Sequence, residues 1–300
     1  MNSDGEQSMS ISTIKQLPFL LSILVLLVLS SCASQTISNK SSVMEYLYPE
    51  TKGDYEAPSL PHLMLPLRVG VAFVPESKNK SYVHNFWTGR SYSSSLTEAK
   101  KNELLNNVAS HFKGLDFVGS IEVIPTTYLT PGGGFSNLSQ IQTMYGIDVI
   151  ALVSYDQVQF TDEGVLSLSY WTVVGAYLVS GEKNDTNTLM DTVVYDISSK
   201  AMLFRAPGVS QVSGKATPIN LSEELRLDSV QGFEVAAENM VKNLKHQLSV
   251  FKASIKNNPK QATVTHREGY SGGGGAVGIF EITMLFLMLI ISFKRKLSAI

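Results

Sequence analysis

Short apolar runs separated by prolines and polar turns predict several buried strands along this chain. Residues 67–74 and 117–124 are each followed by a proline, and residues 147–153 form an almost continuous aliphatic run, as in strands covered on both faces. Later segments rich in β-branched and aromatic residues predict an antiparallel meander, at residues 157–160, 165–179, 189–197 and 201–205, with turns at 181–187 and 198–200.

Apolar residues spaced by three or four positions predict helices at residues 96–112, 138–145 and 223–251. Thr97 is a suitable N-cap for the first helix, and Gly146 ends the second. The order of elements predicts an α+β fold, with a mixed, largely antiparallel sheet and two or three packed helices. This order is similar to that of the periplasmic α/β domains of envelope-assembly lipoproteins, including the curli-secretion type, a likeness of fold that carries no function.

The N-terminal part of the chain has the features of a lipoprotein signal peptide. An apolar stretch at residues 17–29 is too short to favour a membrane-spanning helix, and it ends in small residues. The single cysteine, Cys32, follows directly, and the preceding Leu29, Ser30 and Ser31 resemble the lipobox of bacterial lipoproteins. This resemblance implies that Cys32 receives a diacylglyceryl group before signal peptidase II cuts the chain. The alternative is an N-terminal transmembrane helix beside a buried free cysteine.

The region ahead of this apolar stretch departs from the usual signal peptide, because it contains the acidic residues Asp4 and Glu6. Translation from Met9 would remove both acids and leave Lys15 as the charged residue. We therefore expect the true start at Met9, with Met1 as the alternative.

The C-terminal part combines a glycine run, an apolar segment and a basic cluster. The run contains Ser271, Gly272, Gly273 and Gly274, and the apolar residues 276–293 are long enough, with the glycines, to span a bilayer core. A predicted cytoplasmic stop follows, made of Lys294, Arg295 and Lys296. These parts resemble the GlyGly-CTERM sorting signal, which implies cleavage in the glycine run by a rhombosortase, a rhomboid-like intramembrane serine protease. The alternative is an ordinary C-terminal anchor with a flexible linker.

A lipobox and a GlyGly-CTERM tail on one chain resemble the rhombotarget lipoprotein family of Gram-negative bacteria. The resemblance implies an inner-membrane precursor and a mature form held by lipid at the outer membrane or the cell surface. It also implies lipoprotein-processing enzymes, a rhomboid-like sorting protease and type II secretion components as partners. Ala33, rather than an aspartate, follows Cys32, which fits transfer to the outer membrane in such lipoproteins.

These signals divide the chain into five predicted parts. Residues 1–31 are the signal peptide, 32–65 a tether, 66–252 the α+β domain, 253–270 a polar stalk and 271–300 the sorting tail. The tether and the stalk are predicted from polar composition and weak hydrophobic periodicity.

Composition and charge exclude some classes of function. The chain is 44% hydrophobic and 17% charged, as in globular proteins, and its formal net charge is −2 without a basic run. A nucleic-acid-binding surface needs clustered Lys and Arg, so we expect no nucleic-acid partner.

Sequence motifs give no catalytic, metal or cofactor site. The five histidines form no HExxH motif, GxSxG is absent, and one cysteine cannot support a cysteine-rich metal cluster. Residues 131–134 could hold an anion at a helix N-terminus, but without the lysine of a P-loop a flexible turn is the better interpretation. Six carboxylates could supply an acid–base pair only if folding brought two of them together: Asp148, Asp156, Asp162, Glu163, Asp191 and Asp196.

Four aromatic residues lie in the polar stretch after the first predicted strand: Tyr82, Phe86, Trp87 and Tyr92. They suit a partner or glycan surface, and they equally suit a cover over the sheet edge, which we favour. We therefore expect a non-enzymatic binding or envelope-assembly domain. The alternative is a secreted or surface-attached hydrolase whose site is assembled only by folding.

Overall fold

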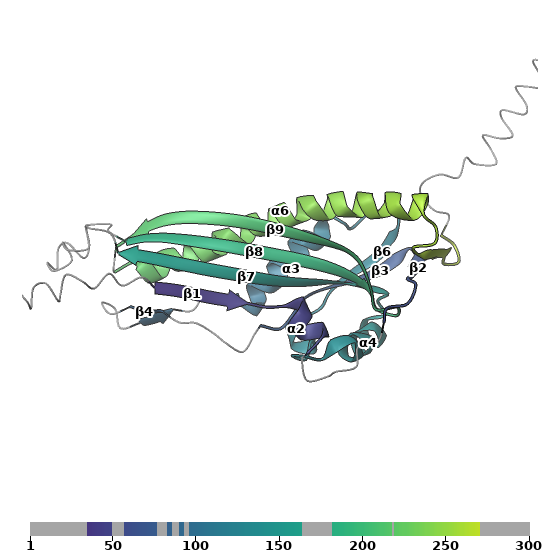
Figure 1. The fold of residues 1–300 in the computed structure, drawn as a ribbon, viewed down its shortest axis with the longest axis horizontal. Helices are drawn as coiled ribbons and strands as arrows, with labels where there is room; N and C mark the ends of the chain where they lie inside the picture. The colour runs from purple at the N-terminus through teal and green to yellow at the C-terminus, as the bar shows by residue number, and fades with distance from the viewer. Residues whose placement is uncertain are drawn as a thin grey trace, which may run out of the picture.

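The computed structural model describes residues 35–49, 57–76, 83–85, 90–92, 96–163, 182–217 and 219–270. These residues form a mixed α/β fold, in which one largely antiparallel sheet carries helices on both faces (Figure 1). The predicted fold class is confirmed at this level.

The main sheet contains five strands in the order β6 (Val118–Val123), β3 (Leu67–Phe73), β7 (Val149–Glu163), β8 (Glu182–Asp196) and β9 (Ala201–Ala216). β3 runs parallel to both of its neighbours, whereas β7, β8 and β9 form an antiparallel meander. A sixth strand, β1 (Gln35–Lys40), pairs with residues 156–161 of β7, on the edge where β3 pairs with residues 149–153. We call the part of the meander that lies beyond β3, residues 156–163 of β7 and the residues facing them, the distal half.

One long helix, α6 (Leu221–Asn257), lies along one face of the sheet (Figure 1). Its 37 residues give it a length of about 55 Å. The helix α3 (Glu98–Ser110) packs beside it, and its predicted N-cap, Thr97, accepts a hydrogen bond from Lys100 N at 3.3 Å. Tyr155 of β7 meets Phe233 of α6 edge to face, with ring centroids 5.2 Å apart. These contacts belong to an apolar core between α6, α3 and the sheet.

Two shorter helices cover the opposite face of the sheet, but only near β3. They are α2 (Val43–Leu47) and α4 (Gly134–Tyr145), preceded by a short 3-10 turn, η1 (Thr126–Tyr128). Their apolar side chains pack with those of β7 and β8 in a second core cluster. The buried Tyr46 hydroxyl donates to Asn137 Oδ1 at 2.8 Å, which joins the two helices.

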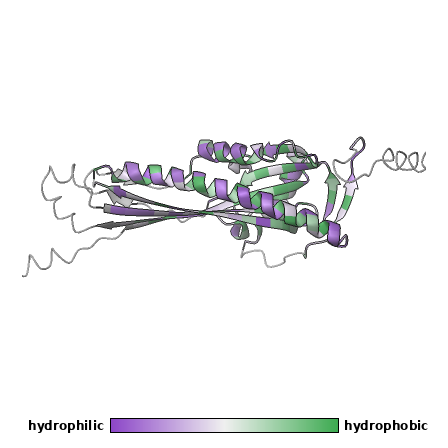
Figure 2. Ribbon diagram, turned by 90° about the horizontal axis from the view of Figure 1, so that it is seen from above, coloured by the Kyte–Doolittle hydropathy of each residue, from purple (hydrophilic) through white to green (hydrophobic). Residues whose placement is uncertain are grey.

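In the distal half, the contact between α6 and the sheet is polar. Gln157 and Gln159 are fully buried there, and Gln157 Nε2 donates to the hydroxyl of Thr188 at 2.7 Å. The Ser229 hydroxyl donates to Gln157 Oε1 at 2.6 Å, and Gln159 Nε2 donates to the Leu225 carbonyl at 2.8 Å. Figure 2 shows the change of character, with hydrophilic strands at the distal end and hydrophobic strands toward the other end. The Nε2 groups of both amides bond to groups on the helix and the next strand, which makes their burial tolerable, whereas the buried Gln159 Oε1 has no hydrogen-bond partner among the described residues.

The predicted tether and stalk are wrong in part, because both contribute regular structure. β1 and α2 lie within residues 32–65, where β2 (His62–Leu65) pairs in parallel with β10 (Thr263–His266) of the expected stalk. β1 is mostly polar, because its backbone pairs with β7 while only Ile37 supplies a buried aliphatic side chain. The folded domain therefore extends beyond the predicted bounds of 66–252 at both ends.

The predicted turn at residues 181–187 is also wrong, since β8 begins at Glu182. Its polar residues Asn184, Thr186 and Thr188 are buried beneath α6, where they pair with polar partners. A small hairpin, β4 (Val83–Asn85) with β5 (Arg90–Tyr92), lies within the aromatic stretch.

No helix among the described residues is both long enough and apolar enough to cross a membrane. The two apolar segments at residues 17–29 and 276–293, and the predicted strand at 165–179, lie outside the described residues.

Replacing Gly208 with alanine should destabilise the fold. A Cβ atom at this position of β9 would lie 2.2 Å from the Ala236 carbonyl oxygen and 2.4 Å from the Met240 nitrogen, so α6 would have to move away. We expect Gly208→Ala to lower the free energy of unfolding by about 3 kcal/mol in chemical denaturation. Val209→Ala is the control, because the Val209 side chain is 63% exposed. Equal stability of the two variants would contradict close packing of α6 on β9.

Candidate functional site

The described residues enclose an apolar cavity of about 320 Å³ between the C-terminal half of α6 and the sheet. This volume falls within the range of about 300–1,000 Å³ that small-molecule sites occupy. The cavity lies at the opposite end of the domain from the distal half, beside β2, β3 and β6. It is the candidate functional site of the described domain.

The floor of the cavity is a smooth aliphatic surface. Val69 and Val71 of β3, Ala151 and Val153 of β7, and Val194 of β8 all contribute to it. Because successive side chains of a strand point to opposite faces, these alternate residues lie on the one face that α6 covers. The roof comes from α6 side chains that recur every three or four residues: Leu244, Leu248, Phe251 and Ile255.

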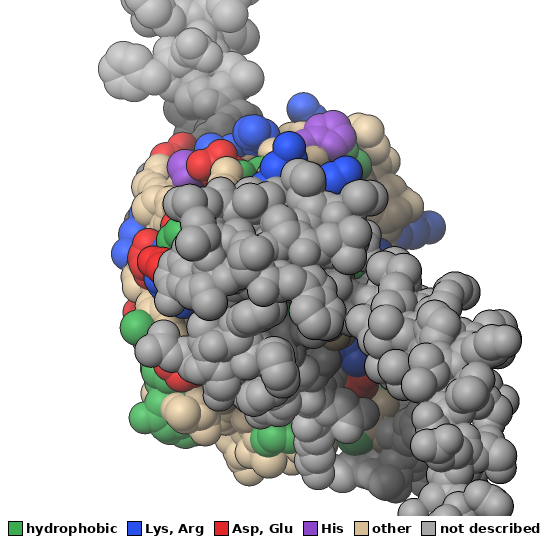
Figure 3. Space-filling model, turned by 90° about the vertical axis from the view of Figure 1, so that its left-hand side faces the viewer, with side chains coloured by type: hydrophobic (Ala, Val, Ile, Leu, Met, Phe, Trp, Pro, Cys, Tyr) green, Lys and Arg blue, Asp and Glu red, His purple; other side chains and the backbone are tan. Residues whose placement is uncertain are grey.

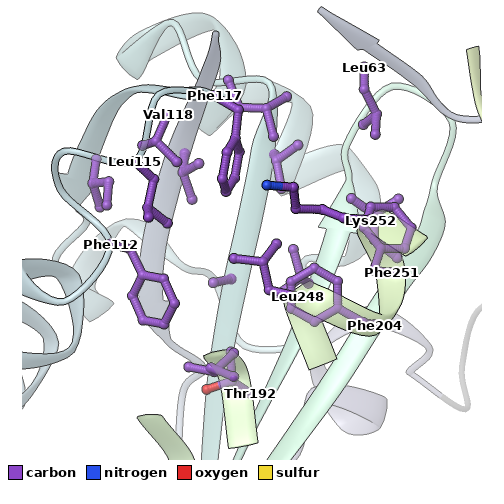
Figure 4. A pocket seen from close by; sticks show the side chains of 18 of the residues that line it. Leu63, Phe112, Leu115, Phe117, Val118, Thr192, Phe204, Leu248, Phe251 and Lys252 are labelled. Carbon is purple, nitrogen blue, oxygen red and sulfur yellow. The ribbon is translucent and has the colours of Figure 1, made fainter. Parts of the chain in front are cut away.

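We call the rim where the exposed residues Lys252 and Lys256 line the cavity its mouth. Phe112, Leu115 and Phe117 stand on one side of the cavity, and Leu248 and Phe251 stand on the other (Figure 4). Lys252 extends from α6 toward Phe117, and its ammonium group lies 4.5 Å from the centre of the Phe117 ring. A cation at this position is attracted to the ring face, so the contact joins α6 to the segment that follows α3.

The lining has few polar groups. Among the described residues, the charged ones in the lining are Lys252 and Lys256, and Thr192 adds a hydroxyl that donates to Met240 Sδ at 2.9 Å. Apart from these two lysines and one engaged hydroxyl, the described walls present only apolar side chains to a bound molecule. They are suited to an apolar chain that needs no hydrogen bonds along its length.

β2 and β10 form one end wall of the cavity. Two arginines that bind the carboxylate of Asp148, which together we call the clamp, hold this wall. Arg68 Nη2 donates to Asp148 Oδ1 at 2.8 Å, and Arg267 Nη2 donates to Oδ2 of the same carboxylate at 2.5 Å. Arg267 Nε also donates to the Pro66 carbonyl at 3.3 Å, which fixes the segment after β10 against the start of β3. Burial raises the pKa of Asp148, but the hydrogen bonds from Arg68 and Arg267 outweigh it, so this pKa lies below its usual value.

Charge is segregated along α6 and the segment that follows it. Residues 221–238 contain five acids and one arginine, whereas residues 239–267 contain five lysines and one arginine without an acid. This order complements the helix dipole, and it also places positive charge at the cavity end. The sequence does not reveal this segment as a basic run, because neutral residues separate its cations.

A second cluster of titratable groups links the end of β3 to α3. Lys101 Nζ, on a nearly buried side chain, lies 3.1 Å from Glu76 Oε1 and 2.9 Å from Glu98 Oε1. The Tyr155 hydroxyl donates to Glu76 at 2.7 Å, and burial, followed by the charge of Glu76, raises the pKa of Tyr155. The phenol therefore stays protonated as a donor, and this cluster has the character of a structural link.

The residues that the sequence singles out for processing lie outside the described residues: Leu29, Ser30, Ser31, Cys32, Ser271, Gly272, Gly273, Gly274, Lys294, Arg295 and Lys296. Tyr82, Phe86 and Trp87 also lie outside them. No group of three or more His, Cys, Asp or Glu residues in the described part of the chain could hold a metal ion.

Three of the six candidate carboxylates have structural partners, whereas Asp156 is exposed on β7. Asp148 lies in the clamp, Asp191 accepts from Arg205 at 2.7 Å, and Asp196 accepts from Ser199. His62 lies 2.9 Å from the Thr265 hydroxyl, across the β2–β10 pair. The stretch 131–134 leads into α4, which starts at Gly134 without a side-chain N-cap.

Comparisons with known proteins give little information. No family model matches the chain, and no curated protein matches it. One similar solved structure is a neuraminyllactose-binding hemagglutinin homologue from Helicobacter pylori, at 8% identity and a TM-score of 0.33, covering 68% of this chain and 97% of that one. Another is a PelC dodecamer from Paraburkholderia phytofirmans, at 9% identity and a TM-score of 0.25, covering 67% of this chain and 99% of that one. At these TM-scores neither structure supports the assignment of a fold family or a function to this chain.

The clamp should make stability depend on pH. Asp148→Asn removes a carboxylate that accepts from two arginines, and we expect a loss of about 1.5 kcal/mol in the free energy of unfolding at neutral pH. Because the folded-state pKa of Asp148 is lowered, its contribution is present above the unfolded pKa of about 4 and is lost as the pH falls through the folded pKa. Denaturation curves of the variant and the wild type should therefore converge in acid.

The matched control for the clamp is Arg226→Ala, which breaks the pair with Glu223 on α6, where both side chains are exposed. It should cost less than Asp148→Asn. A constant difference between Asp148→Asn and the wild type down to pH 2 would contradict the clamp.

Proposed function

We propose that this protein is an exported bacterial envelope lipoprotein whose domain binds the acyl chain of an amphiphilic molecule in the cavity beneath α6. Under this proposal Cys32 carries the lipid anchor, and a rhomboid-like protease cuts the C-terminal glycine run near Gly272 or Gly273. The mature protein is then held at the outer membrane or the cell surface by its own lipid. Lipoprotein-processing enzymes and type II secretion components are its proposed partners.

The observation that carries the binding proposal is the composition of the cavity wall. The floor and roof are aliphatic and aromatic, and the described polar groups of the lining are one engaged hydroxyl and two lysines at the mouth. A bound molecule must therefore be apolar along its buried length and polar at one end. Each methylene group held away from water contributes about 0.8 kcal/mol, and the costs of association oppose this contribution.

The placement of the chain ends fits the membrane proposal. Gln35 pairs with Thr161 at the distal end, three residues after Cys32 in the sequence. The described chain ends at Tyr270, three residues after Arg267, which pairs with Asp148 at the cavity end of the domain. A lipid on Cys32 would therefore hold one end of the domain, and an uncut tail would hold the other.

The intact mass of the protein isolated from its native membrane tests the processing. We expect a species that begins at lipidated Cys32 and ends near Gly272 or Gly273. Cys32→Ser should abolish the lipid and leave the signal peptide attached. A wild-type species that retains Ile300 would overturn the proposed cleavage, and an unmodified Cys32 would overturn the proposed lipidation.

Photocrosslinking of the full chain in its native membrane tests acyl-chain binding. The photoreactive amino acid benzoylphenylalanine would replace Phe112, which lines the cavity. Irradiation should give an adduct with an acyl-bearing lipid, identified by mass spectrometry. The matched control replaces Phe160, which is 43% exposed on the distal half and outside the cavity. Equal lipid adducts at both positions, or none at Phe112, would overturn the proposed function.

A further inference from the structure

We infer that the amphiphile carries an anionic head group, which Lys252 and Lys256 bind at the mouth of the cavity. This inference rests on the proposed function, because it concerns the polar end of a molecule whose acyl chain occupies the cavity. The ligand class is an anionic single- or double-chain lipid, with a phosphate or a carboxylate at the head.

The charged groups of the mouth are all of one sign among the described lining residues. Lys252 and Lys256 lie four residues apart, so they share one side of α6. The stems of both lysines line the cavity while each residue as a whole is exposed, as expected for side chains that place an apolar stem against a wall and an ammonium group in water. An acyl chain in the cavity would bring its head to these two ammonium groups.

The helix dipole explains the position of Lys256 but not that of Lys252. Cations are favoured in the last turn of a helix by its dipole, and Lys256 lies in that turn. Lys252 lies more than one turn before the helix end at Asn257, and its ammonium group lies over Phe117 rather than at the terminal carbonyls. A single ring contact is weak and exchangeable, so an anion can replace Phe117 as the partner of Lys252.

The surroundings of the mouth strengthen the positive potential. Residues 239–260 contribute five lysines and no acid, and Lys245 and Lys260 are exposed. Beyond them Arg267 is paired with Asp148, and the exposed Glu268 follows. Lys113 and Asp116, which flank the other side of the mouth, are exposed and offset each other. The distal end differs, because acidic and basic side chains both occur on the face shown in Figure 3. The part of α6 beside the cavity therefore carries a net positive charge, which favours an anion there.

The test determines which lipids are crosslinked at position 112 in the full chain in its native membrane. The head groups in the adduct should be enriched in anionic lipids by about tenfold over the bulk membrane, since a charge-assisted pair corresponds to about that ratio. The double variant Lys252→Glu with Lys256→Glu should lose this enrichment and retain the adduct. Lys252→Arg should preserve it. The masses also distinguish a phospholipid from a free fatty acid as the source of the anion.

The matched control reverses two other exposed lysines, Lys183→Glu with Lys215→Glu, which face each other across β8 and β9 at the distal end. It makes the same change in net charge and should leave the enrichment intact. Wild-type adducts with the composition of the bulk membrane would overturn the anionic head group while acyl binding stands. Loss of enrichment in both double variants would overturn the role of Lys252 and Lys256, and the absence of any adduct would overturn the proposed function itself.

Discussion

The packing of one long helix on a set of twisted strands determines most of the features of this domain. Strands in a sheet rotate relative to one another, and a helix about 55 Å long does not follow that rotation, so the two surfaces approach closely over only part of their length. Here the close approach occurs at Gly208 and Gly232, where an added carbon would collide with the α6 backbone or with the Thr188 hydroxyl. Beyond this stretch the roof formed by Leu244, Leu248 and Phe251 is separated from the floor, and the cavity lies between them.

The same packing explains why the two halves of the interface differ chemically. Where helix and sheet approach closely, the interface uses small residues and amides that bond across it, as Gln157 does with Ser229. A shift of α6 along the sheet would leave these buried groups without partners, so they define its position more sharply than an aliphatic contact would. Asp228 belongs to this region, where burial and then the charge of Glu224 raise its pKa. The fixed polar half thus holds the helix in place over an apolar half that is not fully packed.

The sequence predicts those strands and helices that bury aliphatic side chains at regular spacing, on one face or on both. The strand expected at 67–74 is observed at Leu67–Phe73, and the helix expected at 96–112 is observed at Glu98–Ser110. The start of β8 was mistaken for a turn, because Asn184 and its neighbours are buried by hydrogen bonding and not by hydrophobicity. The cavity was missed for a different reason. Val71 and Leu248 occupy regularly spaced apolar positions. This spacing is the same whether such a side chain packs against another side chain or borders a cavity.

The position of the cavity relative to the chain ends gives the proposed processing a physical consequence. If a lipid on Cys32 and an uncut tail after Tyr270 both held the chain to a membrane, both ends of the domain would stay near the lipid surface. A cut in the glycine run would leave only the distal end attached. The cavity end could then move away from the bilayer by up to about the length of α6, about 55 Å. Binding at the cavity would therefore occur beside one membrane before the cut, and the bound amphiphile would leave that surface only after it.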